Sequence, residues 1–210
     1  LFYENVSAVS PQRHGDLSID RENFEFAANV NSVPLMAVEM TAAASEYTIV
    51  FAGDDKNVMP VVILGLEGTK NYYVGKDGNW TADYIPAFVR RYPFVFAQNE
   101  NQFTLCVDEE WSGCNREGKG QRLFDDKGER TEYLNRMLKF LEESQAHFAR
   151  TQTYCNHLKE LELLEPMKAD FTFPGGEKKS LGGFMAVNRE KLKNLPPEKL
   201  AELAKTDELE

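Results

Sequence analysis

Arginine and amide side chains that could bind an anion occur in two stretches of the sequence. The first stretch has two adjacent arginines, and the second has two more beside an asparagine and an aspartate. The six residues are Arg90, Arg91, Asn115, Arg116, Arg122 and Asp125. A guanidinium group presents its N–H donors in a planar fork that matches the oxygens of a carboxylate or phosphate. The sequence therefore predicts a ligand-binding patch here, for a small anionic or peptide ligand.

Each arginine also has an explanation that involves no ligand. Arg90 and Arg91 can lie solvated on a short helical turn. One of them can instead pair with a carboxylate of the chain, such as Asp108 or Asp125. Asp125 and Asp126 can likewise neutralise nearby arginines from within. The sequence leaves these alternatives open.

Residue types used in catalysis are present, but their spacing specifies no reaction. His14 and Asp16 stand in a polar loop and could act together as acid and base, although a single loop histidine is more often solvated or hydrogen-bonded. Residues 113–120 have the spacing of a phosphate-binding loop. However, Glu117 lies where a polyphosphate needs cations, and no helix is predicted to begin at Lys119. An enzyme therefore remains only an alternative.

The cysteines and histidines form no metal-ligand pattern. They are Cys106, Cys114, Cys155, His14, His147 and His157. An odd number of widely spaced cysteines fits neither a disulfide framework nor a paired-cysteine zinc site. We therefore expect no metal site and assign no cofactor. Reduced thiols indicate a reducing compartment such as the cytoplasm, and association with the envelope stays open. The paired carboxylates at 54–55 and 125–126 are explained by turn formation.

Aromatic residues are densest in residues 84–97, around two prolines. Four apolar residues there recur at the spacing of one helix face. They are Ile85, Phe88, Val89 and Tyr92. The run Phe94, Val95, Phe96 then predicts a strand. Since one aromatic side chain can bury about 150–250 Å², we expect this segment to lie in the interior.

The pattern of the whole chain predicts an α+β fold in one domain over residues 1–210. Strands are predicted at residues 33–40, 47–51, 60–66, 71–74, 94–96 and 102–107. Their short connections favour an antiparallel β-meander of five or six strands over residues 33–107. A polar, glycine-rich loop follows at residues 108–130.

The remaining part, residues 131–210, is predicted to be mostly helical. Apolar residues at helical spacing predict a long helix from 132 to about 164, capped by Thr131 and interrupted near 151–153. A small hairpin is expected within 171–187. Short helices should follow Asn188 and begin at Pro197. The meander should pack against the long helix and these short C-terminal helices.

Charge and hydropathy argue against nucleic-acid binding and against a membrane span. The 210-residue chain has a net charge of −10, whereas nucleic-acid phosphates attract a basic surface. No apolar run approaches the roughly 20 residues of a membrane span. We therefore expect neither nucleic-acid binding nor a membrane span.

Several motifs resemble the bacterial SapC family over essentially the whole chain. They are residues 31–34 (NSVP), 51–53 (FAG), 59–62 (MPVV), 84–94 (YIPAFVRRYPF), 113–118 (GCNREG), 122–125 (RLFD), 163–166 (LLEP) and 183–185 (GFM). The resemblance implies a link to a surface-layer locus, and members are sometimes labelled as peptide-transport components. It also implies a further apolar helix after residue 210. It supplies no catalytic residues.

Three hypotheses for function follow. The first is a SapC-like accessory protein, linked to the surface layer or to envelope uptake, that binds a small anionic or peptide ligand. The second is an enzyme with an arginine- and aspartate-lined pocket. The third is a module that binds a protein partner through the long helix.

Overall fold

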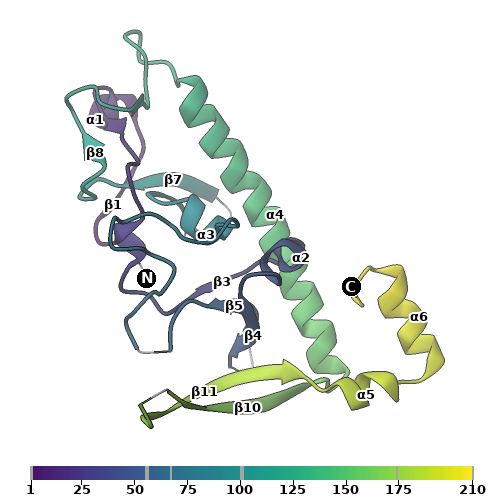
Figure 1. Cartoon of the computed structure of the whole chain (residues 1–210). Coiled ribbons are helices and arrows are strands. Elements are labelled where there is room, and N and C mark those ends of the chain that lie inside the picture. Colours follow the sequence, from purple (N-terminus) through teal and green to yellow (C-terminus); the bar gives the residue numbers. More distant parts are fainter. Residues whose placement is uncertain (1, 55–56, 67, 100–101, 174, 210) are drawn as a thin grey trace. The chain divides into compact units, whose positions relative to one another are not determined.

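The computed structural model describes residues 2–54, 57–66, 68–99, 102–173 and 175–209 (Figure 1). They form two compact units. Unit 1 comprises Leu1–Val30 and Thr69–Ala146, and unit 2 comprises Asn31–Gly68 and His147–Glu210. The α+β class with antiparallel sheets, a long helix and short C-terminal helices is confirmed. That both units form one domain stays a prediction. Asp55 of the first carboxylate pair lies outside the described residues.

The first sheet of unit 1 pairs a strand near the N-terminus with a hairpin from the middle of the chain. Its order is β1-β7-β6, with β1 at Val6–Ala8, β6 at Phe94–Asn99 and β7 at Gln102–Asp108. The predicted strands at 94–96 and 102–107 are thus confirmed as a hairpin. The N-terminal strand β1 was not predicted, because its three residues carry no alternating pattern of their own.

Two of the three strands of the second sheet of unit 1 lie within the predicted polar loop at residues 108–130. Strands β8 (Cys114–Asn115) and β9 (Gln121–Arg122) pair with opposite edges of β2 (Ser18–Ile19). Ser18 stands opposite both Asn115 and Arg122. The loop therefore straddles β2. Short helices α1 (Pro11–His14), η1 (Glu25–Ala27) and α3 (Ala87–Arg90) complete this part of unit 1.

The core of unit 1 combines these sheets with the first half of helix α4 (Glu132–Glu160). Its buried residues are Leu17, Ile19, Phe94, Val107, Leu123, Phe124, Leu134 and Leu141. The predicted cap is confirmed, since the Thr131 hydroxyl accepts the N–H of Leu134 at 3.3 Å. The aromatic segment is interior as predicted: Tyr92 and Phe94 are buried, Phe88 and Phe96 are half-buried, and the Tyr92–Pro93 peptide bond is cis.

Unit 2 contains a five-stranded antiparallel sheet in the order β10-β11-β4-β5-β3. The strands are β3 (Ser32–Pro34), β4 (Thr48–Gly53), β5 (Val58–Ile63), β10 (Leu164–Thr172) and β11 (Lys178–Val187). The predicted single meander over 33–107 is therefore divided, because β6 and β7 join β1 in unit 1. Some 30 residues separate β5 from β6, which is far too long for a hairpin connection.

Two of the predicted strands are wrong in detail. Only the start of 33–40 is a strand, and η2 (Ala37–Glu39) and α2 (Met40–Ala43) follow it. Residues 71–74 form a turn with one isolated bridge between Val74 and Trp80. The buried Asn71 amide sets this turn, because it donates to the Ala27 carbonyl and accepts the N–H of Tyr73. A side chain that binds the backbone in this way competes with strand pairing.

The second half of α4 packs in the core of unit 2, with Phe51, Val58, Cys155, Leu158 and Leu163. The helix is not interrupted at 151–153. The buried Thr151 hydroxyl donates to the His147 carbonyl at 2.8 Å and accepts the Ala37 N–H at 2.9 Å, so its polar atom is satisfied without a break. None of the described helices combines the length and the apolar character of a membrane-crossing segment.

The C-terminal elements follow their local signals. Helix α5 (Arg189–Lys193) is capped by Asn188, which accepts the N–H of Lys191, and α6 (Pro197–Lys205) begins at its proline. The predicted hairpin exists but is longer than expected, from β10 to β11. Strand β10 stands at one end of the strand order, and its pairing has a register shift between Met167 and Ala169.

Candidate functional site

Two glycines, Gly113 just before β8 and Gly120 just before β9, allow this part of the polar loop to lie tightly against β2 and the residue that follows it. A Cβ atom on Gly120, whose φ is +79°, would lie 2.2 Å from the Ile19 carbonyl oxygen. A Cβ atom on Gly113 would lie 2.7 Å from the Asp20 carbonyl oxygen and 2.5 Å from the Trp111 ring. The glycines of this phosphate-loop-like motif therefore permit close contact between backbones.

Asn115 organises the same loop from within. Its side-chain oxygen accepts the N–H groups of Glu117 and Lys119, both at 3.1 Å. Its amide nitrogen donates to the Lys119 carbonyl at 3.0 Å and to the Ser18 carbonyl at 3.5 Å. An asparagine side chain has two donors and two acceptor positions. All four are used inside the protein, so Asn115 shapes the loop and leaves no free group for a ligand.

A pocket of about 370 Å³ opens between this loop and the residues that follow β2. Its lining includes Asp20, Glu22, Asn23, Trp111, Asn115, Glu117 and Lys119. We call it the Trp111 pocket. The indole is held in place by edge contacts with Tyr92 at 5.3 Å and Phe26 at 5.9 Å between ring centroids. One wall is therefore a fixed aromatic group, and the rest is polar.

The carboxylates of the Trp111 pocket differ in how they are compensated. Glu117 forms an ion pair with Lys119 at 2.7 Å, and this contact lowers the pKa of Glu117. The pKa of Lys119 is raised, first by Glu117 and further by Asp20 and Glu22. Within the described part of the chain, no hydrogen bond or ion pair reaches the carboxylates of Asp20 and Glu22. Two negative charges thus remain available at this pocket.

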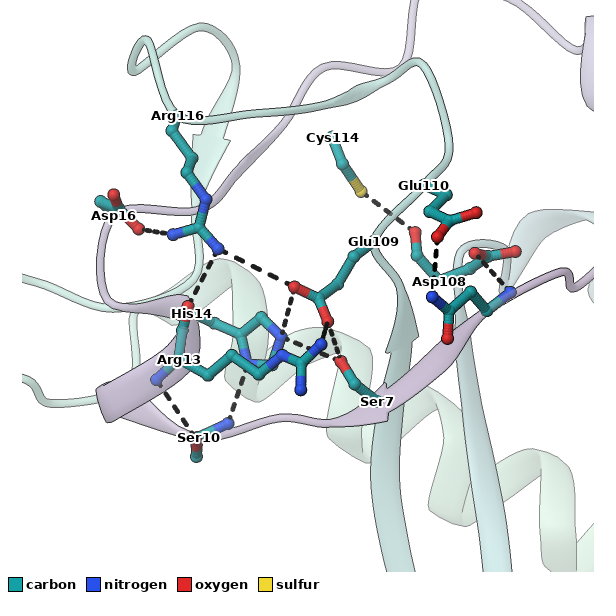
Figure 2. Close-up of polar contacts among 11 residues, drawn as sticks. Ser7, Ser10, Arg13, His14, Asp16, Asp108, Glu109, Glu110, Cys114 and Arg116 are labelled. Atoms are coloured by element: carbon teal, nitrogen blue, oxygen red, sulfur yellow. Dashed lines mark hydrogen bonds and ion pairs between the residues drawn. The ribbon is translucent and has the colours of Figure 1, made fainter.

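A second polar cluster lies where β1 and α1 meet the end of β7. Figure 2 shows Glu109 between the His14 imidazole and the guanidinium groups of Arg13 and Arg116. Arg13 contacts Glu109 at 2.7 Å, and Arg116 approaches it at 3.8 Å. The Ser7 hydroxyl donates to Glu109. We call Ser7, His14 and Glu109, with their arginines, the Glu109 network.

The protonation of His14 decides what the Glu109 network can do. The imidazole is fully buried, and its Nδ1 accepts the Ser10 N–H at 3.1 Å. In the neutral ring the proton must then sit on Nε2, which faces the Ser7 Oγ at 3.2 Å. Burial also lowers the pKa of His14, which favours this neutral form. Because Nε2 already carries a proton, His14 cannot accept one from Ser7 as a catalytic base would.

Glu109 and Cys114 are equally unsuited to reactive roles. Burial alone would raise the pKa of Glu109, but hydrogen bonds from Ser7 and Arg13 outweigh it and hold this pKa below its ordinary value. Burial raises the pKa of Cys114 to about 12, and its Sγ donates to the Asp108 carbonyl at 3.3 Å. A weakly basic carboxylate and a protonated thiol indicate a structural network.

Three of the six predicted site residues have internal partners on the turn regions of unit 1. Arg116 pairs with Asp16 and donates to the Arg13 carbonyl. Arg122 pairs with Asp126 at 2.6 Å and donates to the Gly15 carbonyl at 3.2 Å. Asp125 accepts two backbone N–H groups in its own turn, those of Lys127 and Glu129, both at 2.9 Å.

The other two arginines lie against aromatic rings. Arg90 donates to the Ile85 carbonyl at 2.9 Å and stands 5.2 Å from the Phe140 ring centroid. Arg91 stacks 4.1 Å from the ring centroid of Phe88. The expected carboxylate Asp108 is instead occupied by the Tyr92 hydroxyl and by two backbone N–H groups near the N-terminus.

Of the six residues, only Asn115 lines the Trp111 pocket. Arg116 and Arg122 come together on the turn at residues 13–16. Sequence reasoning missed Asp20, Glu22 and Trp111 as pocket residues. The signal that could have found them is the pair of glycines at 113 and 120, which indicates a close approach by another backbone segment.

A family model described as SapC matches residues 9–210. The chain belongs to the SapC family. The predicted resemblance is therefore confirmed over nearly the whole sequence. Comparison of this SapC-family chain with curated proteins and with solved structures gave no match.

The buried His14 gives the SapC-family chain a predictable pH dependence. Its folded pKa is lowered below the ordinary 6.5, so the unfolded chain takes up the proton more readily. The free energy of unfolding of unit 1 should therefore fall as pH is lowered through 6.5, by at most about 1.4 kcal/mol per pH unit. Thermal melting followed by tryptophan fluorescence at pH 7.5 and 5.5 would measure it, because Trp80 and Trp111 both lie in unit 1.

A matched variant separates this effect from that of His157. The pKa of His157 is raised, chiefly by its hydrogen bond to Glu208. Its contribution to the free energy of unfolding therefore grows as pH is lowered, whereas that of His14 shrinks. In a His157→Gln background, His14→Gln should abolish the loss on acidification. Equal pH dependence with and without His14 would contradict its assignment as a buried neutral imidazole.

Proposed function

We propose that this SapC-family chain is a binding protein whose Trp111 pocket takes a small peptide, in a role linked to the surface layer or to envelope uptake. The observation that carries the proposal is the Trp111 pocket itself. It combines a fixed indole wall with the Asp20 and Glu22 carboxylates, which accept no hydrogen bond and form no ion pair within the described residues. Both carboxylates act on Lys119 only by raising its pKa. Its volume of about 370 Å³ falls within the range of small-ligand sites, which is roughly 300–1,000 Å³.

The pocket chemistry supports a peptide better than a small anion. An anion would meet Asp20, Glu22 and Glu117, with only Lys119 to attract it. The arginines that suggested an anionic ligand are engaged with carboxylates, carbonyl groups or aromatic rings of the protein. A peptide offers N–H groups and an ammonium terminus to the carboxylates and an apolar side chain to the indole.

The two alternative functions have less support. For an enzyme, the Glu109 network has the residue types of an acid–base site, but the proton on His14 Nε2 points the wrong way for activating Ser7. For a helix-mediated interaction, α4 buries its apolar residues Leu134, Leu141 and Leu158 in the unit cores. Among its described residues, Phe148 is the one large apolar side chain that is exposed.

Nuclear magnetic resonance of the isotope-labelled chain tests the proposal. We expect a short peptide at millimolar concentration to shift the indole N–H signal of Trp111. The Trp80 signal should stay in place, because Trp80 stacks on Tyr73 and does not line the pocket. Trialanine, trilysine and triglutamate are suitable probes. If none of the three moves the Trp111 signal, the proposed binding function is wrong.

A genetic measurement tests the biological role separately. Deletion of the gene should impair surface-layer assembly or uptake of peptides from the medium. Restoring the intact gene should recover it. Unchanged assembly and unchanged uptake in the deletion strain would contradict the envelope role while leaving peptide binding to be judged by resonance.

A further inference from the structure

We propose that the Trp111 pocket selects positively charged peptides, through a lysine or arginine side chain or an amino terminus placed between its carboxylates and its indole. The inference rests on the proposed function, because it names the chemical class of ligand for the same pocket.

The first support is the balance of charge. Among the lining residues, Asp20, Glu22 and Glu117 are acidic and Lys119 is basic. Since Lys119 is held by Glu117 at 2.7 Å, the uncompensated charge belongs to Asp20 and Glu22. Ionised groups beside a low-dielectric wall attract a counter-charge more strongly than groups in open solvent. The net charge of −10 over the whole chain adds to this attraction.

The second support is how the backbone presents the two carboxylates. Asp20 and Glu22 both line the pocket, while Arg21 between them donates to the Arg90 carbonyl at 2.8 Å. The Arg21 guanidinium is thereby bound at a backbone carbonyl and forms no ion pair with either carboxylate within the described residues.

The third support is the indole. A cation binds favourably over an aromatic face, and tryptophan is the best of the aromatic side chains for this contact. Tyr92 and Phe26 fix the Trp111 ring at 5.3 Å and 5.9 Å between centroids. Gly113 leaves room for the ring, because a Cβ atom there would lie 2.5 Å from it. The pocket thus has an aromatic wall beside two carboxylates.

An organic cation fits this pocket better than a metal ion. No group of three or more histidine, cysteine, aspartate or glutamate residues in the described ranges is arranged to hold a metal. A volume of about 370 Å³ is also that of a molecular ligand. A peptide with an ammonium or guanidinium group satisfies the volume, the charge and the indole together.

The experiment compares trilysine, trialanine and triglutamate by titration of the Trp111 indole signal. We expect trilysine to bind about tenfold more tightly than trialanine, and triglutamate to bind weakest. Added salt should reduce the preference, since these carboxylates are accessible to solvent. The variant Asp20→Asn with Glu22→Gln keeps the side-chain shapes and should abolish the preference.

A control variant removes the same charge elsewhere. Glu129 and Glu142 are exposed residues of unit 1 that do not line the pocket. Glu129→Gln with Glu142→Gln should keep the trilysine preference. If this control loses it equally, or if trialanine or triglutamate binds as tightly as trilysine, the inference is overturned while peptide binding at the pocket stands. If no peptide binds, the proposed function itself fails.

Discussion

Replacing Phe94 with alanine should lower the free energy of unfolding of unit 1 by about 3–5 kcal/mol, the usual cost of truncating a fully buried phenylalanine. Phe94 is completely buried and lies in the core formed by the two sheets of unit 1 and α4. Its ring also contacts Tyr133 of α4 at 6.1 Å between centroids. Removing it leaves a cavity where the strand meets the helix. Chemical denaturation followed by tryptophan fluorescence would measure the loss.

Phe103 provides the matched control in the neighbouring strand β7. Its side chain is 47% exposed, so Phe103→Ala should cost less than about 1 kcal/mol. If the two substitutions destabilise unit 1 to a similar extent, the interior position of the aromatic segment at residues 84–97 is wrong.

Replacing Gly120 with alanine should have the next largest effect and should also destroy the Trp111 pocket. The new Cβ atom would lie 2.2 Å from the Ile19 carbonyl oxygen, and the backbone would have to hold φ at +79°. The left-handed conformation costs about 1–2 kcal/mol for a residue with a Cβ atom, and the overlap adds about 1–3 kcal/mol. We expect β9 to separate from β2, a loss of about 2–5 kcal/mol, and loss of the peptide-induced shift at Trp111.

Gly118 separates these two costs. It has nearly the same backbone angle, a φ of +76°, but a Cβ atom there would meet nothing within 4 Å. Gly118→Ala should therefore cost only about 1–2 kcal/mol and should retain peptide binding. An equal loss of binding in both variants would show that the left-handed backbone conformation of the loop, and not its contact with β2, maintains the pocket.

Local features of the fold could be predicted from the sequence, whereas strand partners could not. The cap at Thr131 and the helix start at Pro197 depend on neighbours within one turn, and both are confirmed. The pairing of Val6 with Asp108 joins residues about a hundred positions apart. No periodicity within either strand specifies that contact. The pairing of distant strands therefore could not be predicted from the local pattern of strands and turns.

The candidate site divides in the same way. Residues 113–120 stood out because they are polar and rich in glycine, and they do form one side of the pocket. The other side comes from Asp20 and Glu22, in a part of the chain for which no helix or strand was predicted. Arg116 suggested a ligand because its internal partner Asp16 is a hundred positions away in the sequence. The sequence showed which residues carry a charge. Which of these charges are paired with one another could be seen only in the folded structure.

The outer strands of the five-stranded sheet have a consequence for how the protein behaves at high concentration. A free strand edge can recruit the edge of another molecule and start fibril growth. Strand β3 is three residues long and ends in Pro34, which lacks an N–H donor. Strand β10 has Pro166, the charged residue Lys168 and a shifted register beside it. Both borders therefore resist edge-to-edge joining, so this sheet should stay free of amyloid-like aggregation while folded.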